Sequence, residues 1–171
     1  ALVGHSERRH IFSEHDRDTR QKVQAAFRND TIPVLCVGET AIERAEGETS
    51  DVIHDQLSGG LANITSEEAE RLVIAYEPVW AIGTGKHALP GDVERAVRAI
   101  RSQVKHLFGA KTAESVRVLY GGSVTSDSAG SYLAVRGVDG LLVGSTSLNV
   151  HAFADIIKKA QTPINHGVAK K

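Results

Sequence analysis

The segment AYEPVWAIGTGK, residues 75–86, ends an apolar run in a single carboxylate, Glu77. A carboxylate at the end of a buried strand either acts as a general base or forms a structural ion pair at the rim of a sheet. Pro78 favours the first interpretation, because proline holds its own backbone and that of Glu77 extended and so fixes the direction of the side chain. Residues 83–86, GTGK, follow, and such small residues are typical of a loop that moves.

Glycine-rich turns follow two further apolar runs. Gly121-Gly122-Ser123 comes directly after Tyr120, and Gly144-Ser145 comes directly after Val143. Glycine allows backbone N–H groups to approach an anion closely, and the amino end of a following helix favours negative charge. Two such turns side by side predict a phosphate site, whereas either turn alone is more often a plain connection between a strand and a helix.

Other reactive side chains give weaker indications. His5 follows the apolar pair Leu2-Val3, but a lone histidine in a loop is usually only solvated. His5, His10 and His15 recur every fifth residue, a spacing that does not place ligands on one helix face, so no metal site is expected. Cys36 lies within an apolar run and is expected in the core rather than as a nucleophile.

The elements that must position these residues alternate along the chain. Runs rich in Val, Leu and Ile predict parallel strands covered on both faces, at 2–3, 33–37, 72–76, 116–120 and 141–143. Helices are predicted over 17–28, 51–61, a short stretch after Ser66, 90–108, and a segment near Asn149 that buries Phe153, Ile156 and Ile157. This order predicts an α/β fold, either a doubly wound sheet or part of an eight-stranded barrel. Both architectures bind ligands at the carboxyl ends of the strands.

The composition favours a globular chain that binds neither nucleic acid nor a membrane. The formal net charge of the 171 residues is -1, and no apolar run approaches the roughly 20 residues that span a bilayer. The single cysteine excludes an internal disulfide and fits a reducing compartment, so we expect a cytoplasmic protein. The first residues, ALVGHSERR, are typical of the end of a buried strand, and we therefore expect the chain to be a fragment of a longer domain.

Several motifs occur together: GHSERR at 4–9, CVGET at 36–40, AYEPVWAIGTGK at 75–86, YGGSV at 120–124 and DGLLVG at 139–144. Their order and approximate spacing resemble those of the triosephosphate isomerases, from residue 1 to about residue 160. The resemblance implies the TIM (β/α)8 barrel rather than the doubly wound sheet. Residues 1–160 would form the C-terminal part of a single barrel domain, without roughly the first three βα units and most of the fourth strand, and residues 161–171 would form a tail.

The resemblance also implies roles for individual residues. Glu77 matches the family's catalytic base, His5 its neutral electrophile, and Glu7 a carboxylate that supports proton transfer. Residues 78–86 match the mobile lid, and the positions that match phosphate-binding residues are Gly83, Ser123, Gly144 and Ser145. The implied reaction interconverts dihydroxyacetone phosphate and glyceraldehyde 3-phosphate in glycolysis and gluconeogenesis. It needs no cofactor or metal, and the full-length protein would be a homodimer.

Two features depart from the family pattern. Ser145 stands where members usually have a second glycine, so a side chain enters the phosphate site. No lysine follows a predicted strand, although the family carries a catalytic lysine after its first strand. We therefore expect these residues alone to be inactive. Two alternatives remain open: a non-catalytic barrel fragment that serves as a binding or assembly module, and a phosphate-binding barrel with other chemistry.

Overall fold

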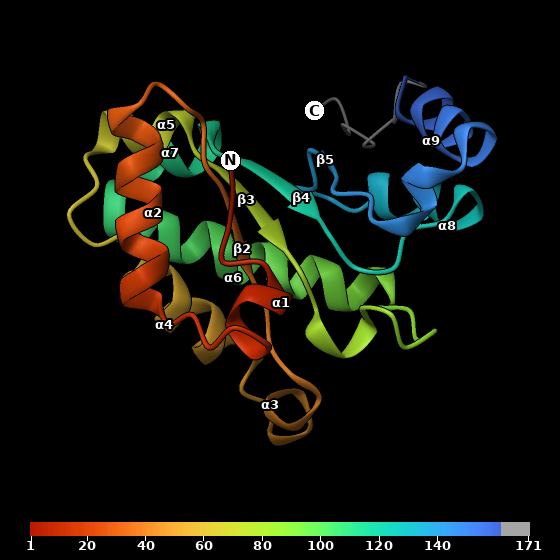
Figure 1. Cartoon of the computed structure of the whole chain (residues 1–171), viewed down its shortest axis with the longest axis horizontal. Coiled ribbons are helices and arrows are strands. Elements are labelled where there is room, and N and C mark those ends of the chain that lie inside the picture. The colour runs from red at the N-terminus through yellow and green to blue at the C-terminus, as the bar shows by residue number, and fades with distance from the viewer. Residues whose placement is uncertain (162–171) are drawn as a thin grey trace, which may run out of the picture.

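The computed structural model describes residues 1–161, which are built around a parallel sheet of five strands (Figure 1). The strands lie side by side in sequence order: β1 (Leu2–Val3), β2 (Val34–Val37), β3 (Val73–Tyr76), β4 (Arg117–Tyr120) and β5 (Gly140–Leu141). A doubly wound sheet reverses its strand order at a switch point, and this sheet does not. Consecutive parallel neighbours are the topology of a TIM barrel, so the predicted α/β barrel fold is confirmed over the described part of the chain.

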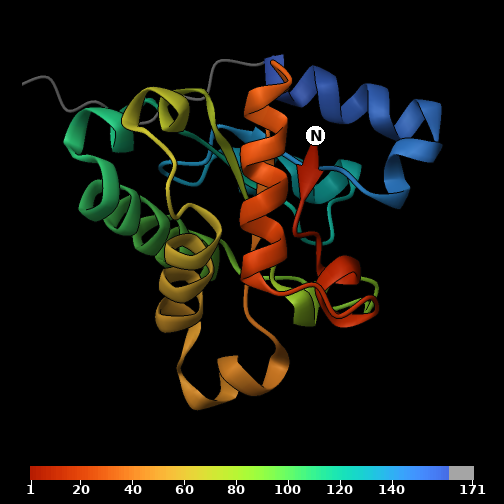
Figure 2. The same ribbon diagram turned by 60° about the vertical axis from the view of Figure 1, so that its left-hand side comes forward.

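Helices connect the strands. The longer ones are α2 (Asp16–Arg28), α4 (Thr49–Gly60), α6 (Pro90–Phe108) and α9 (Val150–Gln161). The shorter ones are α1 (Ser6–His10), α3 (Ala41–Glu46), α5 (Ser66–Arg71), α7 (Ala110–Ser115) and α8 (Ser126–Leu133), together with the 3-10 turns η1 (Val79–Ala81) and η2 (Ser145–Leu148). Helices α2, α4, α6 and α7 pack in that order, and α8 packs with α9 at the far end beside β5 (Figures 1 and 2). Within residues 1–161, no helix has both the length and the apolar character to cross a membrane.

The hydrophobic core lies between the sheet and these helices. Alternate residues of the central strands point outward into it: Leu35, Val37, Ile74, Tyr76, Val118 and Tyr120. The facing stripe of α6 is fully buried and consists of Val93, Val97, Ile100 and Val104. Burying one such aliphatic side chain contributes about 1.5–3 kcal/mol, so the central strands and their carboxyl ends are held firmly.

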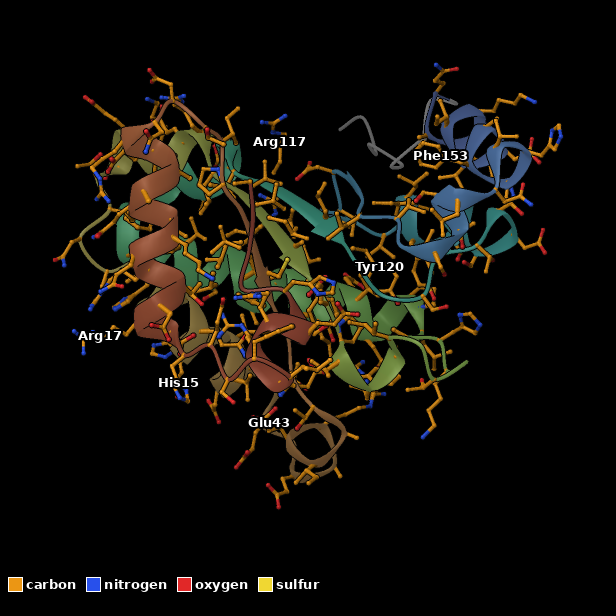
Figure 3. The ribbon with its side chains drawn as sticks, viewed as in Figure 1. His15, Arg17, Glu43, Arg117, Tyr120 and Phe153 are labelled. Atoms are coloured by element: carbon orange, nitrogen blue, oxygen red, sulfur yellow. The ribbon has the colours of Figure 1, made fainter. Side chains whose placement is uncertain are left out.

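The sequence prediction for α9 is wrong at two positions. Ile156 is buried, but Phe153 is 36% exposed and Ile157 is 44% exposed. Figure 3 labels Phe153 on α9. The helix packs mainly against α8 and η2, so only one narrow stripe of its apolar residues meets a partner within residues 1–161. The predicted tail, 161–171, lies outside the described residues except for Gln161, which ends α9.

Candidate active site

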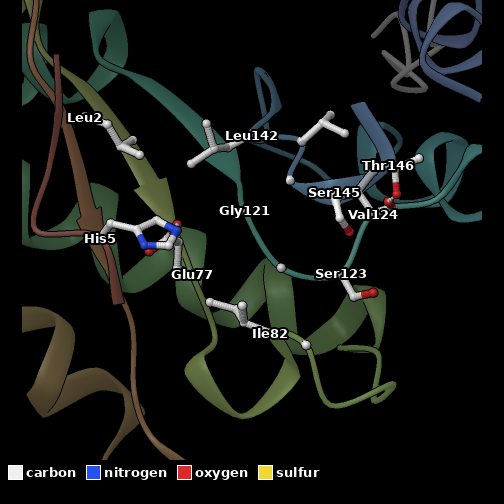
Figure 4. A pocket seen from close by; sticks show the side chains of 14 residues that line it. Leu2, His5, Glu77, Ile82, Gly121, Ser123, Val124, Leu142, Ser145 and Thr146 are labelled. Atoms are coloured by element: carbon white, nitrogen blue, oxygen red, sulfur yellow. Dashed lines mark hydrogen bonds and ion pairs between the residues drawn. The ribbon is translucent and has the colours of Figure 1, made fainter. Parts of the chain in front are cut away.

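His5 and Glu77 meet at the carboxyl ends of two strands that are not neighbours. His5 follows β1 and caps α1, whereas Glu77 follows β3, and β2 lies between the two strands. Nε2 of His5 lies 3.2 Å from Oε1 of Glu77 (Figure 4). The curvature of the sheet therefore brings together the imidazole and the carboxylate that the sequence singled out separately.

The backbone around His5 favours one neutral form of its imidazole. The N–H of Glu7 donates to Nδ1 of His5 at 3.3 Å. A ring nitrogen that accepts a hydrogen bond carries no proton, so the proton of the neutral ring lies on Nε2. This Nε2–H group faces Glu77 and the adjoining cavity, where it can donate to a carboxylate or to an oxygen of a ligand.

Burial makes the Glu77 carboxylate more basic than a free glutamate. The residue is only 3% exposed, and the loss of water raises the pKa of its carboxyl above the ordinary value. The positive charge that His5 can carry and the Ser6 N–H, which donates to Oε2 at 3.1 Å, partly offset this rise in pKa. A base with a raised pKa is better matched to removing a proton from carbon near neutral pH.

Two glycines give Glu77 its position, and the sequence analysis assigned neither of them a role toward it. A Cβ at Gly38 would lie 1.9 Å from the carbonyl oxygen of Glu77, so no other residue fits where the chain leaves β2. A Cβ at Gly121 would lie 3.0 Å from Cγ of Glu77 and would crowd its side chain. Ser6 was also missed. The roles of these three residues depend on contacts between the ends of different strands. The spacing of residues within one local stretch of sequence therefore does not predict them.

A cavity of about 270 Å³ opens beside the His5–Glu77 pair. Figure 4 shows this pair at one end of the cavity and Ser123, Ser145 and Thr146 at the other. All four predicted phosphate-binding residues line it: Gly83, Ser123, Gly144 and Ser145. The remaining lining residues are Leu2, Ile82, Gly121, Gly122, Val124, Leu142, Val143 and Thr146. The structure thus places the two glycine-rich turns side by side, as the phosphate hypothesis requires.

The electrostatics of this cavity rest on backbone N–H groups. Within the described chain, the N–H groups of Gly122, Ser123, Gly144 and Ser145 donate to no other group of the protein. Free N–H groups at a turn form a site for an anion. Among residues 1–161, no lysine or arginine lines the cavity, and Glu77 is the one acidic residue that does. In residues 1–161, no three His, Cys, Asp or Glu side chains are grouped so that they could hold a metal ion.

Glu7 is placed differently from the other predicted catalytic residues. Its side chain is exposed, and the residue does not line the cavity. Its contribution to the site in this structure is the backbone N–H that orients His5. The predicted role of the Glu7 carboxylate in proton transfer therefore rests on the family resemblance alone.

The predicted lid, residues 78–86, has an anchored half and an open half. Nε1–H of Trp80, in η1, donates to Oε1 of the fully buried Glu39 at 2.8 Å, and the Arg44 guanidinium lies 3.9 Å from the centroid of the indole ring. Beyond η1, Gly83 and Gly85 have φ angles of +66° and +72°, and residues 83–87 are exposed. A loop with one anchored end and a left-handed glycine segment is suited to hinge over the cavity.

The sequence of this chain is similar to the sequences of known proteins over most of its length. The family model for triosephosphate isomerase matches residues 1–160. A triosephosphate isomerase of Clostridium tetani (strain Massachusetts / E88) is 46% identical over 156 residues, which cover 91% of this chain and 61% of the relative. One of Carboxydothermus hydrogenoformans is 48% identical over 157 residues, covering 92% of this chain and 62% of the relative. The chain thus spans about three fifths of the length of the relatives it matches, and it belongs to the triosephosphate isomerase family.

Proposed function

We propose that this chain carries the acid–base site of an isomerase that interconverts dihydroxyacetone phosphate and glyceraldehyde 3-phosphate. The observation that carries the proposal is the 3.2 Å approach of His5 Nε2 to Glu77 Oε1 at the edge of a cavity whose far end offers free backbone N–H groups. One end of the cavity thus suits a carbon acid, and the other suits a phosphate group. The relatives that match 91–92% of this chain are named for this reaction.

The geometry suits proton transfer between adjacent carbons. The Glu77 carboxylate removes a proton from the carbon next to the substrate carbonyl, and the electron pair moves onto the carbonyl oxygen to give an enediolate. The Nε2–H of His5 donates a hydrogen bond to that oxygen as its negative charge develops, a role established for the neutral histidine of this family. Glu77 then returns the proton to the neighbouring carbon, and the hydroxyl proton of the enediolate moves from the oxygen of one carbon to the oxygen of the other. Together these transfers complete the isomerisation without a net gain or loss of protons or electrons.

The cavity also indicates how the substrate would be held. Its phosphate would accept from the N–H groups of Ser123, Gly144 and Ser145, and the lid segment that contains Gly83 would cover it. Exclusion of water by the lid strengthens Glu77 as a base and shields the enediolate. Glu7 would support the site through its orientation of His5.

The 171-residue chain alone is expected to convert substrate at a negligible rate. The cavity wall in the described chain contains no cationic side chain to neutralise a phosphate dianion or the developing enediolate. In the part of the chain that the structure describes, strands β1 and β5 each have a neighbour on one side only, so both edges of the sheet are open there. We propose that cytoplasmic turnover in glycolysis and gluconeogenesis belongs to a longer protein that forms a homodimer.

A coupled assay of NADH oxidation tests the function. We expect negligible turnover from the 171-residue chain and clear turnover from a chimera. The chimera adds to this chain the portion of the Clostridium tetani relative that has no counterpart in it. A folded chimera that is inactive, but that still binds inorganic phosphate, would favour the alternative function, a binding or assembly module. The open edges of β1 and β5 are the observation in favour of that alternative. Ordinary activity of the chain alone would refute the expected inactivity.

A further inference from the structure

The two turns that form the phosphate end of the cavity separate after the last bond of the sheet. The backbone N–H of Leu142 donates to the Tyr120 carbonyl at 2.8 Å, and this is the final main-chain bond between the β4 and β5 segments. Beyond it, residues 121–124 and 143–146 both line the phosphate end of the cavity. The pairing of β4 with β5 ends at Tyr120 and Leu141, so it does not fix the distance between the two turns where their free N–H groups lie.

One side-chain hydroxyl reconnects the turns. Oγ1 of Thr146 donates to the carbonyl oxygen of Val124 at 2.6 Å. Within residues 1–161 this is the one hydrogen bond between the segments 121–125 and 143–148. Val124 is 5% exposed and Thr146 is partly buried, so the bond is sheltered from competing water.

Both partners of this bond are themselves held in place. The backbone N–H of Asn149 donates to the Thr146 carbonyl at 3.2 Å, which closes the turn η2. Val124 precedes Thr125, whose hydroxyl accepts from the Ser128 N–H at 3.2 Å and caps α8. The bond between Thr146 and Val124 thus joins η2 to the start of α8 and closes a backbone ring around the N–H groups of Ser123, Gly144 and Ser145.

We infer that Thr146 is a positioning residue for the phosphate site: its hydroxyl fixes the distance between the two sets of backbone N–H donors. The inference rests on the proposed function, in which those donors bind the substrate phosphate. An anion that bridges two turns binds best when the N–H donors are already at the right separation, because binding then loses little free energy to the ordering of the two turns. Thr146 acts through the backbone of Val124 and needs no contact with the substrate.

The test uses the 171-residue chain and inorganic phosphate as the probe. Thr146→Val keeps the shape of the side chain and removes the hydroxyl, whereas Thr146→Ser keeps the hydroxyl. Ser147→Ala is a matched control, because the Ser147 hydroxyl donates to the Gly144 carbonyl of its own turn at 2.7 Å and does not join the two turns. Phosphate affinity is measured from the amide chemical shifts of Ser123 and Ser145. Amide hydrogen exchange of residues 121–125 and 144–147 is measured without phosphate.

We expect Thr146→Val to weaken phosphate binding by roughly three- to tenfold and to accelerate exchange in both turns by a similar factor, as for the loss of one sheltered hydrogen bond. Thr146→Ser and Ser147→Ala should each stay within about twofold of the unmodified chain for both quantities. Equal phosphate affinity of Thr146→Val and the unmodified chain would overturn the positioning role and leave the phosphate site standing. Weaker binding with unchanged exchange would also overturn it, in favour of direct contact between Thr146 and the anion. Failure of the unmodified chain to bind phosphate would overturn the phosphate site itself, and the inference with it.

Discussion

Nε2 of His5 lies 3.2 Å from Oε1 of Glu77, although β2 separates the strands that carry them. Oε2 of the same carboxylate accepts from the N–H of Ser6, the residue that follows His5. The loop after β1 therefore supplies both an imidazole and a backbone donor to the carboxylate at the end of β3. This double contact gives Glu77 a defined orientation in a site where burial raises its pKa.

Replacement of His5 tests its role as a hydrogen-bond donor to the enediolate. His5→Asn keeps a side chain that caps α1 but removes the Nε2–H group. In the active chimera, kcat should fall by about 10²- to 10³-fold, as for the loss of one oxyanion donor, with a smaller change in KM. His10→Asn is the matched control, because His10 lies exposed at the end of the same helix and does not line the cavity. Equal losses in the two variants would contradict a specific role for His5.

The raised pKa of Glu77 predicts how its contribution to stability depends on pH. Between about pH 4.5, where the unfolded carboxyl titrates, and the higher folded pKa, the folded chain binds a proton that the unfolded chain has released. The free energy of unfolding therefore falls as pH rises through this window, and the stabilisation by protonated Glu77 is complete only below about pH 4.5.

Glu77→Gln tests this effect, because the substitution removes the titrating carboxyl and keeps the size of the side chain. Urea unfolding from about pH 4 to about pH 8 should show that the unmodified chain loses stability relative to the variant as pH increases. Parallel stability curves would show that Glu77 has the same pKa in the folded and unfolded states.

Two glycines of the lid form a matched pair for a test of loop function. Gly83 and Gly85 have similar positive φ angles, +66° and +72°, and no atom lies within 4 Å of a Cβ built at either one. Alanine at either position should therefore cost a similar strain of about 1–2 kcal/mol in that loop conformation. Only Gly83 lines the cavity, so only Gly83→Ala should weaken binding of inorganic phosphate to the chain in a titration followed by amide shifts. If Gly85→Ala weakens binding equally, the loop acts through its general conformation and Gly83 has no separate role.

The fold was predictable where periodicity and end signals coincide. Helix α6 spans Pro90–Phe108, as predicted. Its apolar stripe coincides with two end signals, a proline in the first turn and Gly109 directly after the last residue. Helix α3 was missed because it buries no residue and is therefore without periodicity. Its capping box, in which Thr40 and Glu43 exchange hydrogen bonds, was the readable signal for it. The exposure of Phe153 could not be predicted, because the sequence pattern of a helix does not show how many other elements pack around that helix.

The parts of the candidate site that follow the ends of strands could be predicted from the sequence. Glu77, His5 and the two glycine turns begin one to three residues after strands, and a parallel sheet brings such positions to one edge. The need for glycine at Gly38 was hidden, because it depends on the approach of the Glu77 carbonyl from the neighbouring strand. The bond from Thr146 to Val124 was hidden for the same reason.

Glu77→Gln in the active chimera tests the central claim most directly. The substitution keeps the size of the side chain and an oxygen that can accept from Ser6, but it removes the base. We predict that kcat falls by about 10²- to 10⁴-fold while circular dichroism and phosphate binding stay close to those of the parent chimera. Glu114→Gln, an exposed change on α7, should leave kcat unchanged. Near-normal turnover by the Glu77→Gln chimera would contradict the account, because proton transfer would then proceed without the carboxylate that the whole site surrounds.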